Sequence, residues 1–202
     1  MCIICVSRKG IRQPSDKTIA AMYSRNPHGA GYMYARDGKV IIQKGFMDLE
    51  SYLDALHREH FTARDSVVYH FRISTQAGVK PEMTHPFPLT NRLEHCEYLS
   101  LECGLGVAHN GIIQLTTDSR QTRFSDTALF ITRYLVNIIS SPEDLRRKST
   151  LETIFQLARS KFALMDTTGY VATVGEFINE RGLLFSNNSY CMEREWTRAR
   201  RG

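Results

Sequence analysis

The sequence predicts an α+β domain built from layers of sheet and helix. The predicted elements run as strands, a helix, strands, helices and strands, an order that suits segregated sheets and helices better than alternating βαβ units. A length of 202 residues, with 42% hydrophobic and 23% charged residues, is enough for one well-packed globular domain and short for two. We therefore expect a single domain over residues 1–202, with a basic tail at about 193–202.

The first elements follow from local patterns. The uniformly apolar residues 2–6 predict a strand covered on both faces. Residues 17–24 predict a short helical turn, and residues 30–35 and 39–44 predict a hairpin because Asp37-Gly38 favours a tight turn between them. A helix over residues 49–61 is expected next, since Asp48 can cap it and apolar residues recur at helical spacing.

Residues 66–74 give the clearest strand pattern in the chain. Apolar residues alternate with a second face that carries His70 and Arg72. That second face is expected to be either solvent-exposed or the floor of a polar site. The following residues, 78–104, show no strong periodicity and contain three prolines, so they predict a long irregular segment.

The second half predicts further strands and helices. Residues 105–108 and 112–116 predict strands joined at Asn110-Gly111, and Ser125 is expected to cap a long helix over residues 126–140. A Ser149–Glu152 capping box predicts another helix, and the final strands are expected at 161–166, 170–174 and 183–186.

Charge and cysteine content restrict the class of protein. The net charge of +5 is modest and dispersed except in the tail, which argues against nucleic acid as a partner. Five cysteines, an odd number without framework spacing, indicate free thiols and a cytoplasmic location. No apolar run approaches the ~18 residues that cross a bilayer, so no membrane association is expected.

Cys2 has a special chemical position. Removal of the initiator methionine would give it a free α-amine, whose ordinary pKa of about 7.7–8.0 lies just below the thiol value of about 8.5. Such an amine can take the thiol proton, so one residue would supply both nucleophile and base. Taken alone, Cys2 is better explained as the start of a buried strand.

Five further short motifs favour the catalytic explanation of Cys2. In order along the chain, they are Asn26-Pro27-His28-Gly29-Ala30-Gly31, His70-Phe71-Arg72-Ile73-Ser74-Thr75-Gln76-Ala77-Gly78, His85-Pro86-Phe87, Ala108-His109-Asn110-Gly111 and Ser125-Asp126-Thr127. Each is unspecific by itself. Together with Cys2 they resemble the glutaminase domain of class II glutamine amidotransferases, which are N-terminal-nucleophile (Ntn) hydrolases. The resemblance implies a four-layer αββα sandwich of two antiparallel sheets.

The same resemblance implies roles for individual residues. Cys2 would be the nucleophile, and the Asn110 side-chain amide and Gly111 backbone N–H would form the oxyanion hole. Arg72 would bind the α-carboxylate of glutamine with its planar guanidinium, and Asp126 would bind the α-ammonium. Thr75 and His85 match positions that line the substrate pocket, whereas His70 and His109 are expected to stabilise local structure.

The implied reaction hydrolyses glutamine to glutamate and ammonia through a γ-glutamyl thioester on Cys2, with no cofactor and no metal. Complete amidotransferases of this class also carry a synthase domain. No Gly-x-x-x-x-Gly-Lys phosphate loop occurs in this sequence, so we expect a separate synthase or ligase to accept the ammonia. A zinc site formed by Cys2, Cys5, Cys96 and Cys103 is not favoured, because the second pair is spaced too widely.

Two alternatives remain at the level of sequence. A hydrolase of another γ-glutamyl amide would need the same recognition of the amino-acid head group. A non-catalytic binding module, using the arginine-rich tail on nucleic acid, would instead show binding that weakens steeply with salt.

Overall fold

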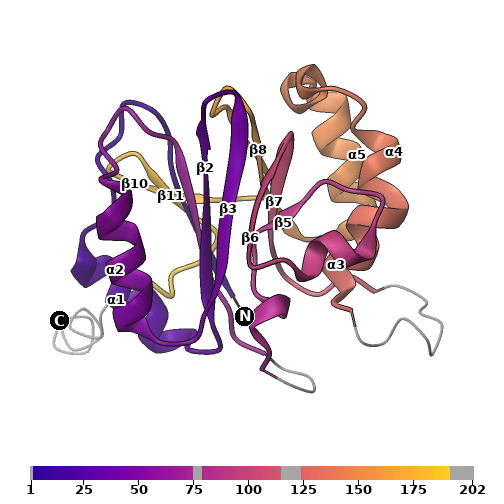
Figure 1. Ribbon diagram of the computed structural model, residues 1–202. Coiled ribbons are helices and arrows are strands. Elements are labelled where there is room, and N and C mark those ends of the chain that lie inside the picture. The colour runs from indigo at the N-terminus through magenta and orange to yellow at the C-terminus, as the bar shows by residue number, and fades with distance from the viewer. Residues whose placement is uncertain (1, 75–78, 115–123, 192–202) are drawn as a thin grey trace, which may run out of the picture.

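The structure is a computed structural model, and it describes residues 2–74, 79–114 and 124–191 (Figure 1). Thr75, the basic tail and the end of the predicted 112–116 strand lie outside the described residues.

The described residues form two antiparallel sheets, which confirms the predicted α+β class. In spatial order the seven-stranded sheet contains β10 (Ile178–Glu180), β11 (Leu183–Phe185), β1 (Ile3–Ser7), β4 (Val67–Phe71), β2 (Ala30–Arg36), β3 (Lys39–Phe46) and β6 (Ser100–Cys103). The four-stranded sheet contains β5 (Phe87–Pro88), β7 (Leu105–Asn110), β8 (Lys161–Asp166) and β9 (Val171–Val174).

Helices lie on the outer faces of the two sheets (Figure 1). The α-helices are α1 (Asp16–Arg25), α2 (Leu49–Glu59), α3 (Asp126–Phe130), α4 (Val136–Ile138) and α5 (Lys148–Ala158). Short 3₁₀ turns form η1 (Pro81–Met83), η2 (Leu93–Glu97) and η5 (Pro142–Arg146), and a π-helical turn forms η4 (Ile131–Leu135). None of the helices in the described part of the chain has the length and apolar character needed to cross a membrane.

Three apolar clusters hold these layers together. One packs α1 and α2 against the seven-stranded sheet, and a second fills the space between the two sheets. The third packs α3, η4, α4 and α5 against the outer face of the four-stranded sheet. The order of layers is therefore helix, sheet, sheet, helix, as Figure 1 shows from left to right.

Strand β1 lies inside the larger sheet, as its uniform hydrophobicity predicts. It pairs with β4 along one edge and with β11 along the other. Ile3 and Cys5 face the α1–α2 layer, whereas Ile4 and Val6 face the second sheet. Because every side chain of this strand is buried, no polar residue is needed on either face.

A hairpin and a helix start that were predicted from local sequence patterns are confirmed. β2 and β3 form the predicted hairpin, with both Asp37 and Gly38 at positive φ, as a tight primed turn requires. Asp48 caps α2 by accepting a hydrogen bond from the backbone N–H of Ser51 at 2.8 Å. Tyr52 on that helix is buried against the sheet.

The predicted 66–74 strand is shorter, and its polar face is not exposed. β4 ends at Phe71 and pairs with β1 and β2 along its two edges, and all of its side chains are buried, so both its faces are covered. His70 points into the layer between the sheets and is fully buried. Arg72 lies just beyond the strand, where its backbone N–H donates to the carbonyl of Gly29 at 2.8 Å.

The prediction of a hairpin at Asn110-Gly111 was wrong. β7 continues to Asn110 but pairs with β5 and β8, and residues 112–114 form no strand. The segment 78–104 is also more ordered than expected, because it contributes β5, the edge strand β6 and two 3₁₀ turns. Residues 178–180 add another short strand, β10, that the sequence pattern did not indicate.

The helices of the second half begin or continue differently from the prediction. Ser125 does cap α3, but the expected single helix passes through the π-helical turn η4 before α4. The helix assigned to the Ser149 capping box begins earlier, at Lys148, without a side-chain cap. Asp144 instead forms a capping box with Ser141 at the start of η5.

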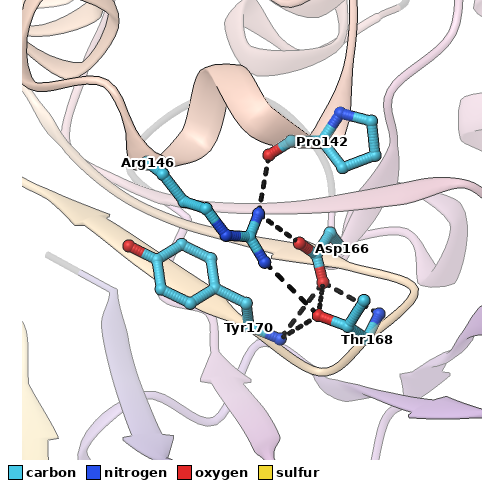
Figure 2. Close-up of polar contacts among 5 residues, drawn as sticks. All are labelled: Pro142, Arg146, Asp166, Thr168 and Tyr170. Carbon is cyan, nitrogen blue, oxygen red and sulfur yellow. Dashed lines mark hydrogen bonds and ion pairs between the residues drawn. The ribbon is translucent and has the colours of Figure 1, made fainter.

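A buried carboxylate fastens η5 to the turn between β8 and β9 (Figure 2). The Arg146 guanidinium donates to Asp166 Oδ2 at 2.8 Å, and Thr168 donates to Asp166 Oδ1 through both its hydroxyl and its backbone N–H. The same guanidinium lies over the ring of Tyr170. Burial raises the pKa of Asp166, but the hydrogen bonds from Thr168 and Arg146 outweigh it, so the net pKa lies below the usual value.

We expect Asp166→Asn to lower the free energy of unfolding by roughly 1.5–3 kcal/mol near pH 7, because hydrogen bonds to a charged group are lost. The loss should vanish in acid, since the stabilisation from a depressed carboxyl pKa exists above the unfolded value of about 3.9 and disappears as the pH falls through the folded value. Urea unfolding at several pH values measures both effects. Glu102→Gln is the control, because its ion pair with Lys39 is exposed.

Candidate active site

Several strand ends meet at one end of the layer between the sheets. β1 begins where β4 ends, since Ile3 lies opposite Phe71. Ser186 follows β11 and hydrogen-bonds to Ile4 of β1, and it also contacts Asn110 at the end of β7. The topology therefore brings the start of the chain together with residues that lie far away in sequence.

The Cys2 thiol is largely buried at this end. It donates to the backbone carbonyl of Ile73 at 3.8 Å, and the Asn187 side chain donates to the Cys2 carbonyl at 2.6 Å. Burial raises the pKa of the Cys2 thiol, while the Ile73 contact and the nearby Arg72 charge oppose the rise. The thiol therefore needs a base to become a nucleophile at neutral pH.

Arg72 interacts electrostatically with both Cys2 and Asp126. Its Nη2 donates to the hydroxyl of Ser74 at 3.3 Å, whereas its Nη1 is buried without a hydrogen-bond partner among the described residues. Burial lowers the pKa of Arg72, and the charges of Cys2 and Asp126 oppose that change. A buried guanidinium nitrogen with no acceptor is suited to receive an anionic group such as a carboxylate.

The loop before β2 supports Arg72 from behind. The backbone N–H of His28 donates to the Arg72 carbonyl at 2.9 Å, and the Ser74 backbone N–H donates to the His28 ring at 2.9 Å. Gly31 is also required for space, because a Cβ there would lie 2.2 Å from the carbonyl oxygen of His85. These contacts join the first of the sequence motifs to the second and the third.

The Asn110 side chain reaches towards β1. Its Nδ2 donates to Ser186 Oγ at 2.9 Å, and Ser186 Oγ also accepts from the backbone N–H of Ile4 at 2.9 Å. Asn110 Oδ1 is buried and has no hydrogen-bond partner among the described residues. The amide thus has one engaged end and one unpaired end close to the start of the chain.

Gly111 is fixed by packing rather than by a hairpin. Its φ is +148°, and a Cβ would lie 1.9 Å from the hydroxyl of Ser160. That hydroxyl also contacts His109 Nε2 at 2.8 Å and the Asn110 carbonyl at 3.4 Å. The buried network therefore sets the backbone path through Asn110 and Gly111.

Asp126 holds the segment that follows Gly111. Its Oδ2 accepts from the backbone N–H of Ile113 at 2.7 Å, and its Oδ1 accepts from the backbone N–H of Thr127 at 2.8 Å. A carboxylate has about four acceptor positions, so these bonds leave capacity for a cationic ligand. The Asp126 charge also acts on the pKa of Arg72, which it raises against the effect of burial.

His85 belongs to a buried group of three histidines rather than standing alone. Its ring lies 4.3 Å from His70 and 6.1 Å from His109, measured between ring centroids. Both of its ring nitrogens are buried without hydrogen-bond partners among the described residues. His70 Nε2 donates to the carbonyl of His109 at 2.9 Å, and His109 contacts the Thr127 and Ser160 hydroxyls.

All three rings are electrically neutral at pH 7. Burial lowers the pKa of both His70 and His109 to about 3, and it lowers the pKa of His85 well below its usual value. The expectation that His70 and His109 act structurally agrees with their hydrogen bonds. His85 packs against them, behind Arg72.

The sequence assigned no role to Ser186 or Asn187. The sequence signal was slight: a strand ending in a short polar run, Ser186-Asn187-Asn188-Ser189. Only the pairing of β1 with β11 shows that this run lies beside Cys2. Thr75, the remaining predicted pocket residue, lies outside the described residues.

No group of three or more His, Cys, Asp or Glu side chains within the described ranges is arranged to hold a metal ion. All five cysteines are free thiols. A scan against protein-family models and a search of curated proteins found no match to this chain. The functional argument therefore depends on the geometry of the site.

We expect the buried histidines to make the protein sensitive to acid. Because their folded pKa values lie below the unfolded value of about 6.5, stability is complete above pH 6.5 and is lost as the unfolded chain binds protons below it. The three rings together should cost roughly 4 kcal/mol between pH 7.5 and 5.5. Urea unfolding at these two pH values measures the change.

His85→Leu isolates one ring, because it breaks no hydrogen bond among the described residues. It should reduce the loss between pH 7.5 and 5.5 by about 1.4 kcal/mol. His57→Gln serves as the control, since His57 is exposed. Equal pH dependence in His85→Leu and wild-type protein would contradict the assignment.

Proposed function

We propose that this protein is a class II glutamine amidotransferase-type glutaminase that hydrolyses the glutamine side-chain amide with Cys2 as nucleophile. The observation that carries the proposal is the meeting of four groups at one end of the sheet interface. They are a thiol, a guanidinium, a carboxylate and an amide: Cys2, Arg72, Asp126 and Asn110.

The charges suit a free amino-acid head group. Arg72 offers a buried guanidinium nitrogen to the α-carboxylate, and Asp126 offers carboxylate oxygens to the α-ammonium. The electrostatic interaction between Arg72 and both Cys2 and Asp126 supports binding of one small molecule by all three. Ammonium and carboxylate recognition together selects an amino acid over a simple amide.

The raised pKa of Cys2 supports a role for its α-amine after removal of Met1. The amine takes the thiol proton as Sγ attacks the side-chain carbonyl carbon of glutamine. Asn110 and the Gly111 N–H stabilise the oxyanion. The C–N bond then breaks and the amine returns the proton to the leaving nitrogen, which gives ammonia. Water cleaves the γ-glutamyl thioester, which releases glutamate and restores the thiol.

The layer order supports assignment to the Ntn-hydrolase type of fold. β1 lies inside one sheet between β11 and β4, and Cys2 directly precedes it. We further propose that the ammonia is used by a separate synthase or ligase, which follows from the resemblance of the motifs to amidotransferases.

We expect Met1-processed protein to release glutamate from glutamine and Cys2→Ala to lose this activity. A coupled glutamate assay measures both. Cys103→Ala is a matched control, because Cys103 is also a partly buried thiol that donates to a backbone carbonyl, that of Leu105 at 3.3 Å. A variant with one extra, uncleaved residue before Cys2 should be nearly inactive, since its α-amine lies on the wrong residue.

The assay also separates the alternatives. Release of glutamate from other γ-glutamyl amides, but not from glutamine, would redirect the proposal to a different hydrolase. Full activity in Cys2→Ala, or no hydrolysis of any γ-glutamyl compound by processed protein with its synthase present, would refute it.

Arg72→Lys should raise the KM for glutamine about tenfold while changing kcat less, because lysine keeps the charge but loses the two-pronged guanidinium contact. Steady-state kinetics measure the two constants separately. Arg36→Lys is the control, since Arg36 forms a partly exposed ion pair with Glu59. An unchanged KM in Arg72→Lys would remove Arg72 from the binding site.

A further inference from the structure

Ser186 connects three parts of the candidate site. Its backbone N–H donates to the Ile4 carbonyl at 2.9 Å, and its hydroxyl oxygen accepts from the Ile4 backbone N–H at 2.9 Å. The same hydroxyl lies 2.9 Å from the Asn110 amide. On the other side, Lys161 donates to the Ser186 carbonyl at 2.7 Å. Ser186 is fully buried, so each of its polar atoms needs a partner.

The hydrogen bonds at the Asn110 amide can be counted. With Nδ2 facing Ser186, the hydroxyl oxygen accepts twice, and Asn110 Oδ1 remains buried without a partner among the described residues. A serine hydroxyl also has one proton to donate. No acceptor for that proton lies within the described part of the chain apart from the Asn110 amide itself.

Rotation of the amide by 180° gives a better arrangement. The Ser186 hydroxyl then accepts from Ile4 and donates to Asn110 Oδ1, so both of these oxygens are satisfied. The two ends of an asparagine amide have nearly the same shape, so the hydrogen bonds decide between the orientations. The remaining group is Nδ2, which takes the position where Oδ1 is now buried and unpaired.

We propose that Ser186 is a positioning residue for glutamine hydrolysis: its hydroxyl donates to Asn110 Oδ1 and holds the amide nitrogen free to stabilise the oxyanion. This inference rests on the proposed function and adds a residue to it. An oxyanion is stabilised by a donor already in place and is repelled by a carbonyl oxygen. Ser186 therefore decides which end of the amide the substrate meets.

A double-mutant cycle tests this role in Met1-processed protein. Ser186→Ala should lower kcat for glutamine about 10- to 100-fold, less than the roughly 10²–10³-fold expected for loss of a donor in Asn110→Ala. KM should stay within about threefold of the wild-type value, because the head-group contacts of Arg72 and Asp126 remain. In the Asn110→Ala background, Ser186→Ala should cause no further loss of kcat.

The cycle distinguishes positioning from a general structural role. Ser186→Ala also removes the acceptor for the Ile4 N–H, and damage from that loss would appear equally with and without Asn110. Equal fold-losses in the two backgrounds, or unchanged kcat in Ser186→Ala, would overturn the inference and leave glutamine hydrolysis itself intact. Inactive wild-type protein would instead refute the proposed function.

Neutron diffraction from crystals of the wild-type protein tests the amide orientation without any variant or activity. It distinguishes nitrogen from oxygen and locates the deuterium atoms. Asn110 Oδ1 facing a deuterium on Ser186 Oγ would support the inference. Nδ2 facing Ser186 would overturn it even in an active enzyme.

Discussion

The structure depends on the complete burial of β1. This strand has no polar face, so it requires apolar layers on both sides and hydrogen-bonding strands on both edges. The α1–α2 layer and the second sheet are the two apolar layers, and β4 and β11 are the hydrogen-bonding strands on the two edges. With β1 fixed in this way, Cys2 has little freedom of position, and its contacts with Ile73 and Asn187 complete the placement.

The site combines rigid support with unpaired polar atoms. His109 and Ser160 fix the backbone at Asn110 and Gly111, and the three histidines fill the layer behind Arg72 as neutral rings. In contrast, Arg72 Nη1 and one end of the Asn110 amide are buried without partners among the described residues. Unpaired buried atoms are costly to the folded state, so their presence at one place agrees with a binding role.

Short sequence patterns correctly predicted the elements that depend on contacts between near neighbours in the chain. Asp37-Gly38 made a tight turn and Asp48 capped a helix, because these effects involve neighbours within a few residues. The same reasoning failed at Asn110-Gly111. There the positive φ of Gly111 belongs to contacts with Ser160, which follows Asn110 by 50 residues. A sequence pattern does not show whether a glycine serves a turn or a distant close contact.

The sequence indicated candidate residues for the site but not the residues that hold them in position. Chemistry and family resemblance indicated Cys2, Arg72, Asn110 and Asp126. In the structure Ser186 links Asn110 to β1, and Arg72 interacts electrostatically with Cys2 and Asp126, while the catalytic and binding roles of the four residues stay predictions. The sequence left open whether His70 faces solvent or a polar site, because the place of β4 in the sheet is a property of the topology. Ser186 was missed for the same reason, since it follows Asn110 by 76 residues.

The pairing of β1 with β11 also has a consequence for the order of events during synthesis. Ile4 is separated by 182 residues from Ser186, so the ribosome must produce nearly the whole described chain before β1 gains its second neighbour. Contacts between such distant residues form late, because the intervening chain must first be ordered. The edge of β1 that pairs with β11 therefore stays unpaired until the residues of β11 have been made.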